Sequence, residues 1–170
     1  MAGLIDSLNG LARRIPVWSV YLLLALPIPW FFYQGLNGGL GRDPVKALEH
    51  VYGLWALRLL IVGLAITPLR RTTGINLLRF RRAVGVMTFA YALAHLMVWA
   101  VLDVQALSRV WADILKRPYI TIGMAGFLCL APLAATSNNW SLRKLGARWR
   151  KLHRLTYVAA LLAGLHFLWL

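Results

Sequence analysis

Acidic residues are scarce in this sequence: five Asp and Glu stand against 19 Lys and Arg, for a formal net charge of +14 at pH 7. So basic a balance is found in nucleic-acid-binding proteins. Here, however, the basic residues lie between long apolar runs, and no soluble domain carries them. The pattern argues against nucleic acid as a partner and is typical of the cytoplasmic loops of a membrane protein.

Cysteine is almost absent as well. The single Cys129 lies inside an apolar run, so the chain has no intrachain disulfide, no CxxC motif and no thiolate metal cage. GxSxG, HExxH, P-loop and GxGxxG motifs are also missing. These absences exclude the common hydrolase, zinc-protease and nucleotide-binding sites, and they leave Cys129 as a packing residue.

Hydrophobic residues make up 60% of the chain and concentrate in five runs. A bilayer core of about 30 Å requires roughly 20 helical residues. The runs therefore predict an all-α fold, a polytopic transmembrane bundle of about five helices. We expect Pro27 and Pro29 to kink the first helix and Pro68 to end the second. The five predicted helices span residues 17–36, 50–67, 83–102, 118–136 and 152–170.

The loop charges predict an orientation. The N-terminal tail, the loop after the second helix and the loop after the fourth hold 13 basic residues and one acid, whereas the alternate loops hold five basic and four acidic residues. Lys and Arg accumulate on the cytoplasmic side of membranes. We therefore expect a multi-pass membrane protein with a cytoplasmic N-terminus, so that the third and fifth helices both run outward.

Two of the four histidines fall at matching depths. His95 lies 13 residues past Arg82 in the third helix, and His166 lies 13 residues past His153 in the fifth. Ionisable groups are costly inside a membrane and usually face the interior of the bundle. Neutral imidazoles at one depth on neighbouring helices suit axial ligation of a heme iron, and we expect His95 and His166 to do this. The stripe that His95 shares with Thr88, Tyr91 and Ala92 would face the macrocycle.

The other ionisable residues leave alternatives open. His153, at the inner start of the fifth helix, would bind a second heme or a quinone headgroup, with Arg81 as its electrostatic partner. Arg58 is either a snorkelling side chain or the counter-ion of a heme propionate. His50 is a ligand, a propionate partner or an interfacial residue. A different class of function, a small transporter or channel-like scaffold, would use the same histidines and Arg58 as a polar path.

Five stretches resemble one family, the heme-binding membrane subunits of the bacterial periplasmic protein-methionine-sulfoxide reductase system, within the ferric-reductase-like transmembrane superfamily. Together they cover most of the chain from Gly38 onward, in family order. The stretches are GGLGRDPVKALEH (38–50), ITPLRR (66–71), LLRFRRAVGVMTFAYALAHL (77–96), KRPYITIG (116–123) and RKLGARWRKLHRLTYVAALLAGLHFLW (143–169).

The resemblance implies that residues 1–170 form one heme-binding transmembrane domain. Such a subunit is a b-type cytochrome without substrate chemistry of its own, with one heme b or two, and its heme histidines match His95, His153 and His166. It would pass electrons from the quinone pool, or from a cytosolic flavin reductase, to a periplasmic molybdopterin-containing subunit that reduces methionine sulfoxide in oxidised proteins. The family is also associated with FMN. Its members continue into a sixth helix after the LHFLW segment, and we expect that helix to be missing here.

Overall fold

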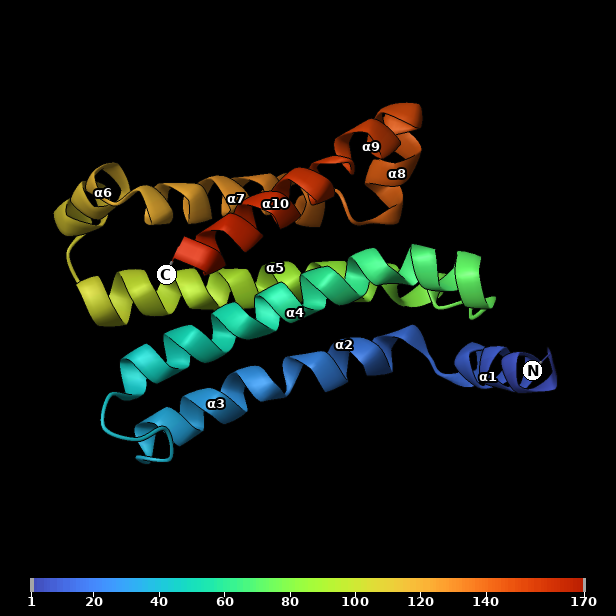
Figure 1. The fold of residues 1–170 in the computed structure, drawn as a ribbon, viewed down its shortest axis with the longest axis horizontal. Helices are drawn as coiled ribbons and strands as arrows, with labels where there is room; N and C mark the ends of the chain where they lie inside the picture. Colours follow the sequence, from blue (N-terminus) through green and yellow to red (C-terminus); the bar gives the residue numbers. More distant parts are fainter. Residues whose placement is uncertain (1, 170) are drawn as a thin grey trace.

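Residues 2–169 are described by a computed structural model, and within this range every regular element is helical. Four helices or helix pairs are long and apolar enough to cross a membrane (Figure 1): residues 17–36, 44–73, 78–104 and 118–135. The helices are α1 (Ala2–Arg14), α2 (Val17–Ala25), α3 (Pro27–Leu36), α4 (Pro44–Thr73), α5 (Arg81–Met97), α6 (Leu107–Lys116), α7 (Pro118–Ala135), α8 (Asn139–Leu145), α9 (Ala147–Leu152) and α10 (Leu155–Trp169). A 3₁₀ turn, Leu78–Phe80, precedes α5, and a π-helix, Val98–Val104, follows it.

The prolines of the first predicted helix interrupt it as expected. Helix α2 ends at Ala25 and α3 begins at Pro27. Since Pro27 and Pro29 have no N–H, carbonyls in this turn lose their helical donors. Two buried tyrosines supply hydrogen bonds nearby: Tyr91 donates to the Leu24 carbonyl (2.9 Å) and Tyr52 to the Ile28 carbonyl (2.6 Å). The interruption therefore also fixes α2 and α3 against α4 and α5.

The second predicted helix is longer at both ends than expected. Helix α4 starts at Pro44, where the Asp43 side chain accepts from the Lys46 N–H (3.1 Å) and caps the first turn. It continues through Pro68, so the expectation that this proline ends it is wrong. A proline within a helix removes one hydrogen bond, which a long packed helix tolerates. The helix stops at Gly74, whose φ of 81° is the left-handed conformation that favours glycine.

The remaining spans deviate less from the prediction. The third runs from the 3₁₀ turn through α5 and continues as the π-helix to Val104, and the fourth, α7, matches residues 118–136 to within one residue. The fifth, α10, begins at Leu155 and has 15 residues, about 22 Å of helix, so it is shorter than the four candidate spans. The predicted end at Leu170 lies outside the described residues.

The bundle has two layers (Figure 1). Helices α2, α3, α4 and α5 lie together, and α7 with α10 lies across α4 and α5. The two most extensive helix contacts are α4 with α5 and α7 with α10. One apolar cluster joins α4 and α5 around Tyr91, and a second joins the layers around Leu60, Leu130 and Ala159. The space between these two closely packed helix pairs is where the histidines lie.

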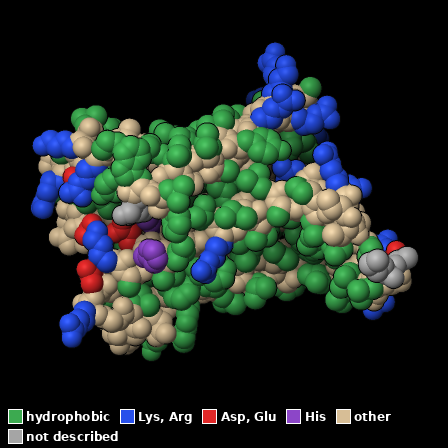
Figure 2. All heavy atoms as spheres, viewed as in Figure 1, with side chains coloured by type: hydrophobic (Ala, Val, Ile, Leu, Met, Phe, Trp, Pro, Cys, Tyr) green, Lys and Arg blue, Asp and Glu red, His purple; other side chains and the backbone are tan. Residues whose placement is uncertain are grey.

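The ends of the bundle differ in charge (Figure 2). Hydrophobic side chains form the middle band, and basic side chains crowd at the end that carries α8 and α9. We call this the basic end; it also contains α1 and the segment 70–82, and it holds the 13 basic residues counted above. The opposite end holds residues 37–49 and 103–117, which carry charges of both signs. Lys46 there contacts Asp103 (2.7 Å) and Glu49 (3.3 Å).

Candidate functional site

His95 of α5 and His166 of α10 face one another between the layers. Their ring centroids are 6.3 Å apart and the rings are inclined by 74°. Both side chains line a cavity of about 200 Å³ that we call the outer cavity. The structure thus brings together the two histidines that the loop charges put at one depth.

Each ring is held by a backbone carbonyl of the neighbouring helix. His95 Nδ1–H donates to the Glu49 carbonyl of α4 (2.8 Å), and His166 Nδ1–H donates to the Tyr119 carbonyl of α7 (2.7 Å). Because a carbonyl can only accept, both rings carry their proton on Nδ1 and keep the Nε2 lone pair free. A neutral imidazole oriented in this way through its other nitrogen is the form that ligates a metal.

A glycine lies beside each of these contacts. A Cβ on Gly53 of α4 would lie 3.2 Å from His95 Nδ1, and a Cβ on Gly123 of α7 would lie 2.8 Å from His166 Nδ1 and Cε1. Each glycine follows its carbonyl residue by four positions. Helical side chains lean back over the preceding turn, so any larger residue at these positions would obstruct the carbonyl. Both imidazoles reach their carbonyls because these two side chains are absent.

Sequence reasoning missed the two glycines and the two carbonyls. The sequence signal for the two glycines is their position: each lies inside an apolar helix that packs against a histidine helix. The carbonyl that each glycine leaves open belongs to the residue four positions earlier. Alanine and threonine on the histidine helices do line the outer cavity, as expected, at Ala92, Thr88, Ala159 and Ala163. Tyr91 does not, because it turns toward α2.

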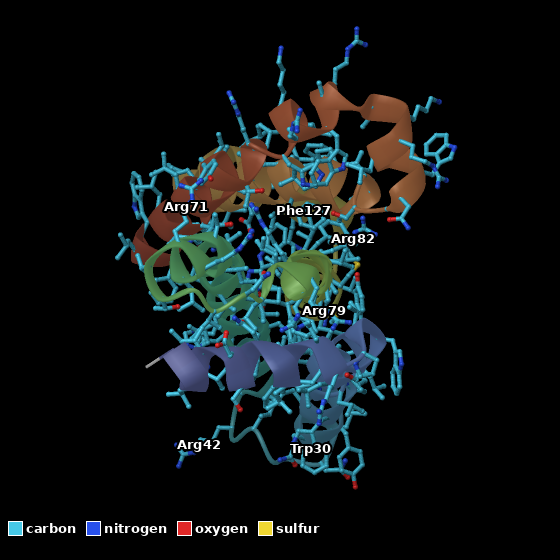
Figure 3. All side chains as sticks on the ribbon, turned by 90° about the vertical axis from the view of Figure 1, so that its right-hand side faces the viewer. Trp30, Arg42, Arg71, Arg79, Arg82 and Phe127 are labelled. Carbon is cyan, nitrogen blue, oxygen red and sulfur yellow. The ribbon has the colours of Figure 1, made fainter. Side chains whose placement is uncertain are left out.

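A second, larger cavity of about 500 Å³ opens toward the basic end, and we call it the inner cavity. His153 and Arg81 line it together, as do Arg79 and Arg82, two of the residues labelled in Figure 3. Arg81 donates to the Thr67 hydroxyl at 3.4 Å. Leu60, Thr88 and Leu130 line both cavities, so the two cavities adjoin one another at these side chains.

His153 does not lie on the helix of His166. It follows α9, and the chain turns at residues 153–154 before α10 begins. On one straight helix, His153 and His166 would lie on different faces, and this turn removes that restriction. Its ring stacks on Trp149 at 3.7 Å. The Thr136 hydroxyl donates to the Pro132 carbonyl (2.6 Å), so it accepts from His153 Nε2–H (3.1 Å). Burial lowers the pKa of His153 below its ordinary value, and the positive charge of Arg81 lowers this pKa further.

The two remaining candidates lie at the periphery. His50 is exposed on α4 and lines the outer cavity beside His95 and His166. Arg58 is exposed on α4 and lines neither cavity, so the structure does not bring it to the histidines. An exposed side chain is what the snorkelling alternative predicts. Among residues 2–169, no three His, Cys, Asp or Glu side chains converge to hold a metal ion.

Comparisons with known proteins identify the family. The family described as "Ferric reductase like transmembrane component" matches residues 52–164. The protein-methionine-sulfoxide reductase heme-binding subunit MsrQ of Agrobacterium fabrum is 50% identical over 165 residues, covering 95% of this chain and 77% of that protein. The MsrQ subunit of Brucella ovis is 53% identical over 153 residues, covering 89% and 70%. No solved structure matches the chain. This multi-pass membrane protein therefore belongs to the ferric-reductase-like transmembrane family, among the heme-binding subunits of protein-methionine-sulfoxide reductases.

Proposed function

We propose that this protein is the b-type cytochrome of a methionine-sulfoxide repair system in the bacterial inner membrane. It carries electrons from the quinone pool, or from a cytosolic flavin reductase, through heme to a periplasmic molybdopterin-containing reductase that repairs oxidised proteins. Its relatives are heme-binding subunits of protein-methionine-sulfoxide reductases, which supports heme binding and a reductase partner. The observation that carries the proposal is the pair of histidines, His95 and His166, held by carbonyls with both Nε2 atoms available.

The residues of the outer cavity fit an axially ligated heme. His95 and His166 would hold the iron between them, and their ring centroids are 6.3 Å apart, which leaves room for one metal ion between two imidazoles. Gly53, Gly123 and Gly126 keep this region free of side chains, and its lining is mainly apolar. Heme supplies one-electron transfer here. The protein orients both histidines through their Nδ1–H groups and leaves each Nε2 available to a metal.

The inner cavity supports a second cofactor, either a second heme with His153 on one side or a quinone headgroup. Arg81 remains protonated and is a poor iron ligand, but it suits a propionate or a quinone oxygen. Leu60, Thr88 and Leu130 line both cavities, so a cofactor bound here would lie next to one bound in the outer cavity. FMN belongs to this proposal only through the family resemblance.

The orientation of the protein is part of the same proposal. The basic end faces the cytoplasm, and the end with residues 103–117 faces the periplasm. The outer cavity, which His50 and Glu49 also line, then lies on the side of the periplasmic partner. A reporter fused within residues 103–117 should be active only in the periplasm, and cytoplasmic activity would reverse the topology.

Single substitutions of the histidines test the ligand assignment. His95→Ala and His166→Ala should each abolish the low-spin heme spectrum of the purified protein, measured as reduced-minus-oxidised absorbance with a pyridine-hemochrome count per chain. His50→Ala is the matched control, because His50 lines the same cavity but is exposed, and it should retain the spectrum. Full low-spin signal in both single variants would refute the assignment. A wild-type protein without a Soret band would refute the cytochrome and favour the transporter alternative.

A further inference from the structure

Helix α1 exposes a stripe of leucines that nothing in the bundle covers. Leu4, Leu8 and Leu11 recur at the spacing of one helical face and are 67%, 40% and 59% exposed. The opposite side of the helix carries Asp6 and Arg13, which are exposed as well. A helix with this division of residues is amphipathic, although it is too short and too polar to span a membrane.

The orientation of α1 is fixed by hydrogen bonds to the basic end. Asn9 accepts from the Asn76 N–H (2.8 Å) and donates to the Gly74 carbonyl (3.1 Å). Arg79 donates to the Ala12 and Arg13 carbonyls at the C-terminus of α1. In Figure 3, which looks along the bundle from this end, α1 lies across the view and so runs crosswise to the spanning helices. The leucine stripe is thus held in the plane that a membrane surface would occupy.

The surface next to the stripe identifies what covers it. Immediately after α1, exposed apolar residues continue through Ile15 onto Trp18 and Leu22 of α2, which is a transmembrane helix. The stripe is therefore continuous with the surface that faces lipid. Arg13 and Arg14 are exposed at its end, where phosphate groups of lipids would neutralise them.

We propose that α1 is an interfacial helix that lies in the headgroup layer of the membrane, with Leu4, Leu8 and Leu11 inserted among the acyl chains. The inserted helix holds Arg79 through its C-terminal carbonyls, and Arg79 lines the inner cavity. The lipid surface thus supports one wall of that cavity. This inference depends on the membrane location of the chain and not on its heme.

Spin labels test the proposal in the full-length protein. Cys129, the only cysteine, is replaced by Ala, and a label is attached at Leu8→Cys or, as the matched control on the polar side, at Asp6→Cys. The protein is reconstituted alone in phosphatidylcholine–phosphatidylglycerol vesicles, and collision with oxygen is compared with collision with a water-soluble nickel chelate. Oxygen should dominate at Leu8 and nickel at Asp6, a reversal of the ratio within two residues.

Equal nickel accessibility at the two positions would overturn the proposal, because the stripe would then face water and be free for a protein partner. Leu4→Cys and Leu11→Cys repeat the measurement at the other stripe positions. A local distortion at Leu8 would leave these two sites protected from nickel, whereas a water-facing helix would expose all three.

Discussion

Replacing Gly123 by Ala should weaken heme binding without unfolding the protein. The new Cβ would lie 2.8 Å from His166 Nδ1 and Cε1, and the ring must move by roughly 0.6 Å to reach the 3.4 Å limit of an ordinary contact. Such a movement stretches the bond from Nδ1 to the Tyr119 carbonyl from 2.7 Å to about 3.3 Å, beyond the usual range for N–H···O. Losing the partner that orients a ligating histidine typically lowers metal affinity by about 10- to 100-fold.

A series of glycine variants separates this effect from helix stability. Alanine stabilises a helix interior by up to about 1 kcal/mol relative to glycine, so the folded state itself should not suffer. At Gly53 the new Cβ would lie 3.2 Å from His95 Nδ1, which requires a movement of only about 0.2 Å and predicts a smaller loss. At Gly164, on the helix of His166, a Cβ would meet nothing within 4 Å. Heme affinity should therefore be highest in Gly164→Ala, lower in Gly53→Ala and lowest in Gly123→Ala.

The measurement is a heme titration of each purified variant, followed by the low-spin absorbance spectrum and the rate of heme transfer to an apoglobin acceptor. Thermal unfolding of the heme-free variants is recorded alongside. If Gly123→Ala binds heme as tightly as Gly164→Ala and gives the same low-spin spectrum, then the carbonyl contact does not position His166 and the reasoning fails.

Three further predictions follow from the charges. Arg58→Leu should leave the heme reduction potential unchanged, because Arg58 lines neither cavity; a clear fall in a redox titration would restore it as a propionate partner. Lys46→Met should change the unfolding free energy by less than about 1 kcal/mol, since its ion pairs are partly exposed. Lys46→Met should also lower the heme reduction potential, because the carboxylates of Glu49 and Asp103 then lack their counter-ion near His95. An unchanged reduction potential would contradict this prediction. His153 has a lowered pKa when folded, so the stability that depends on its neutral form is complete at pH 7 and is lost as the pH falls below 6.5. Thermal melts from pH 8 to 5 should show a larger loss in the wild type than in His153→Gln, whereas parallel curves would refute this prediction.

The sequence predicted the spans well because hydropathy determines them directly, but it predicted their ends poorly. Pro68 was expected to end the second helix, yet helix α4 continues to Gly74, since the cost of one missing hydrogen bond is small beside the packing of a 30-residue helix. Helix α1 was not predicted, because a search for long apolar runs passes over a short amphipathic helix. Some of its side chains pack on the bundle and others are exposed, and only the structure shows which side packs.

The histidine pair could be predicted because loop charges fix how deep each helix starts, and depth along a helix is a matter of counting residues. The rotation of each helix about its own axis could not be predicted from the sequence. An almost uniformly apolar helix such as α4 gives no periodic signal for the side that faces the interior, so Arg58 was open to two interpretations. Tyr91 lies on the same stripe as His95, but its hydroxyl donates to a carbonyl of α2 near the kinked turn. Only the structure reveals this acceptor.

The site is built from the same unit twice. In α4 and α5 the carbonyl of residue 49, Gly53 and His95 form one ligand support; in α7 and α10 the carbonyl of residue 119, Gly123 and His166 form the other. The carbonyl and the histidine are separated by 46 residues in the first unit and by 47 in the second. These units coincide with the two most closely packed helix pairs of the bundle. The orientation of each imidazole is therefore fixed within its own helix pair and does not depend on contacts with the other pair. Only the distance between the rings depends on the contact between layers, through residues such as Leu60, Leu130 and Ala159. Substitutions in that contact should alter how firmly heme is held while leaving both histidine–carbonyl bonds intact, whereas substitutions at the glycines should weaken heme binding by disturbing those bonds.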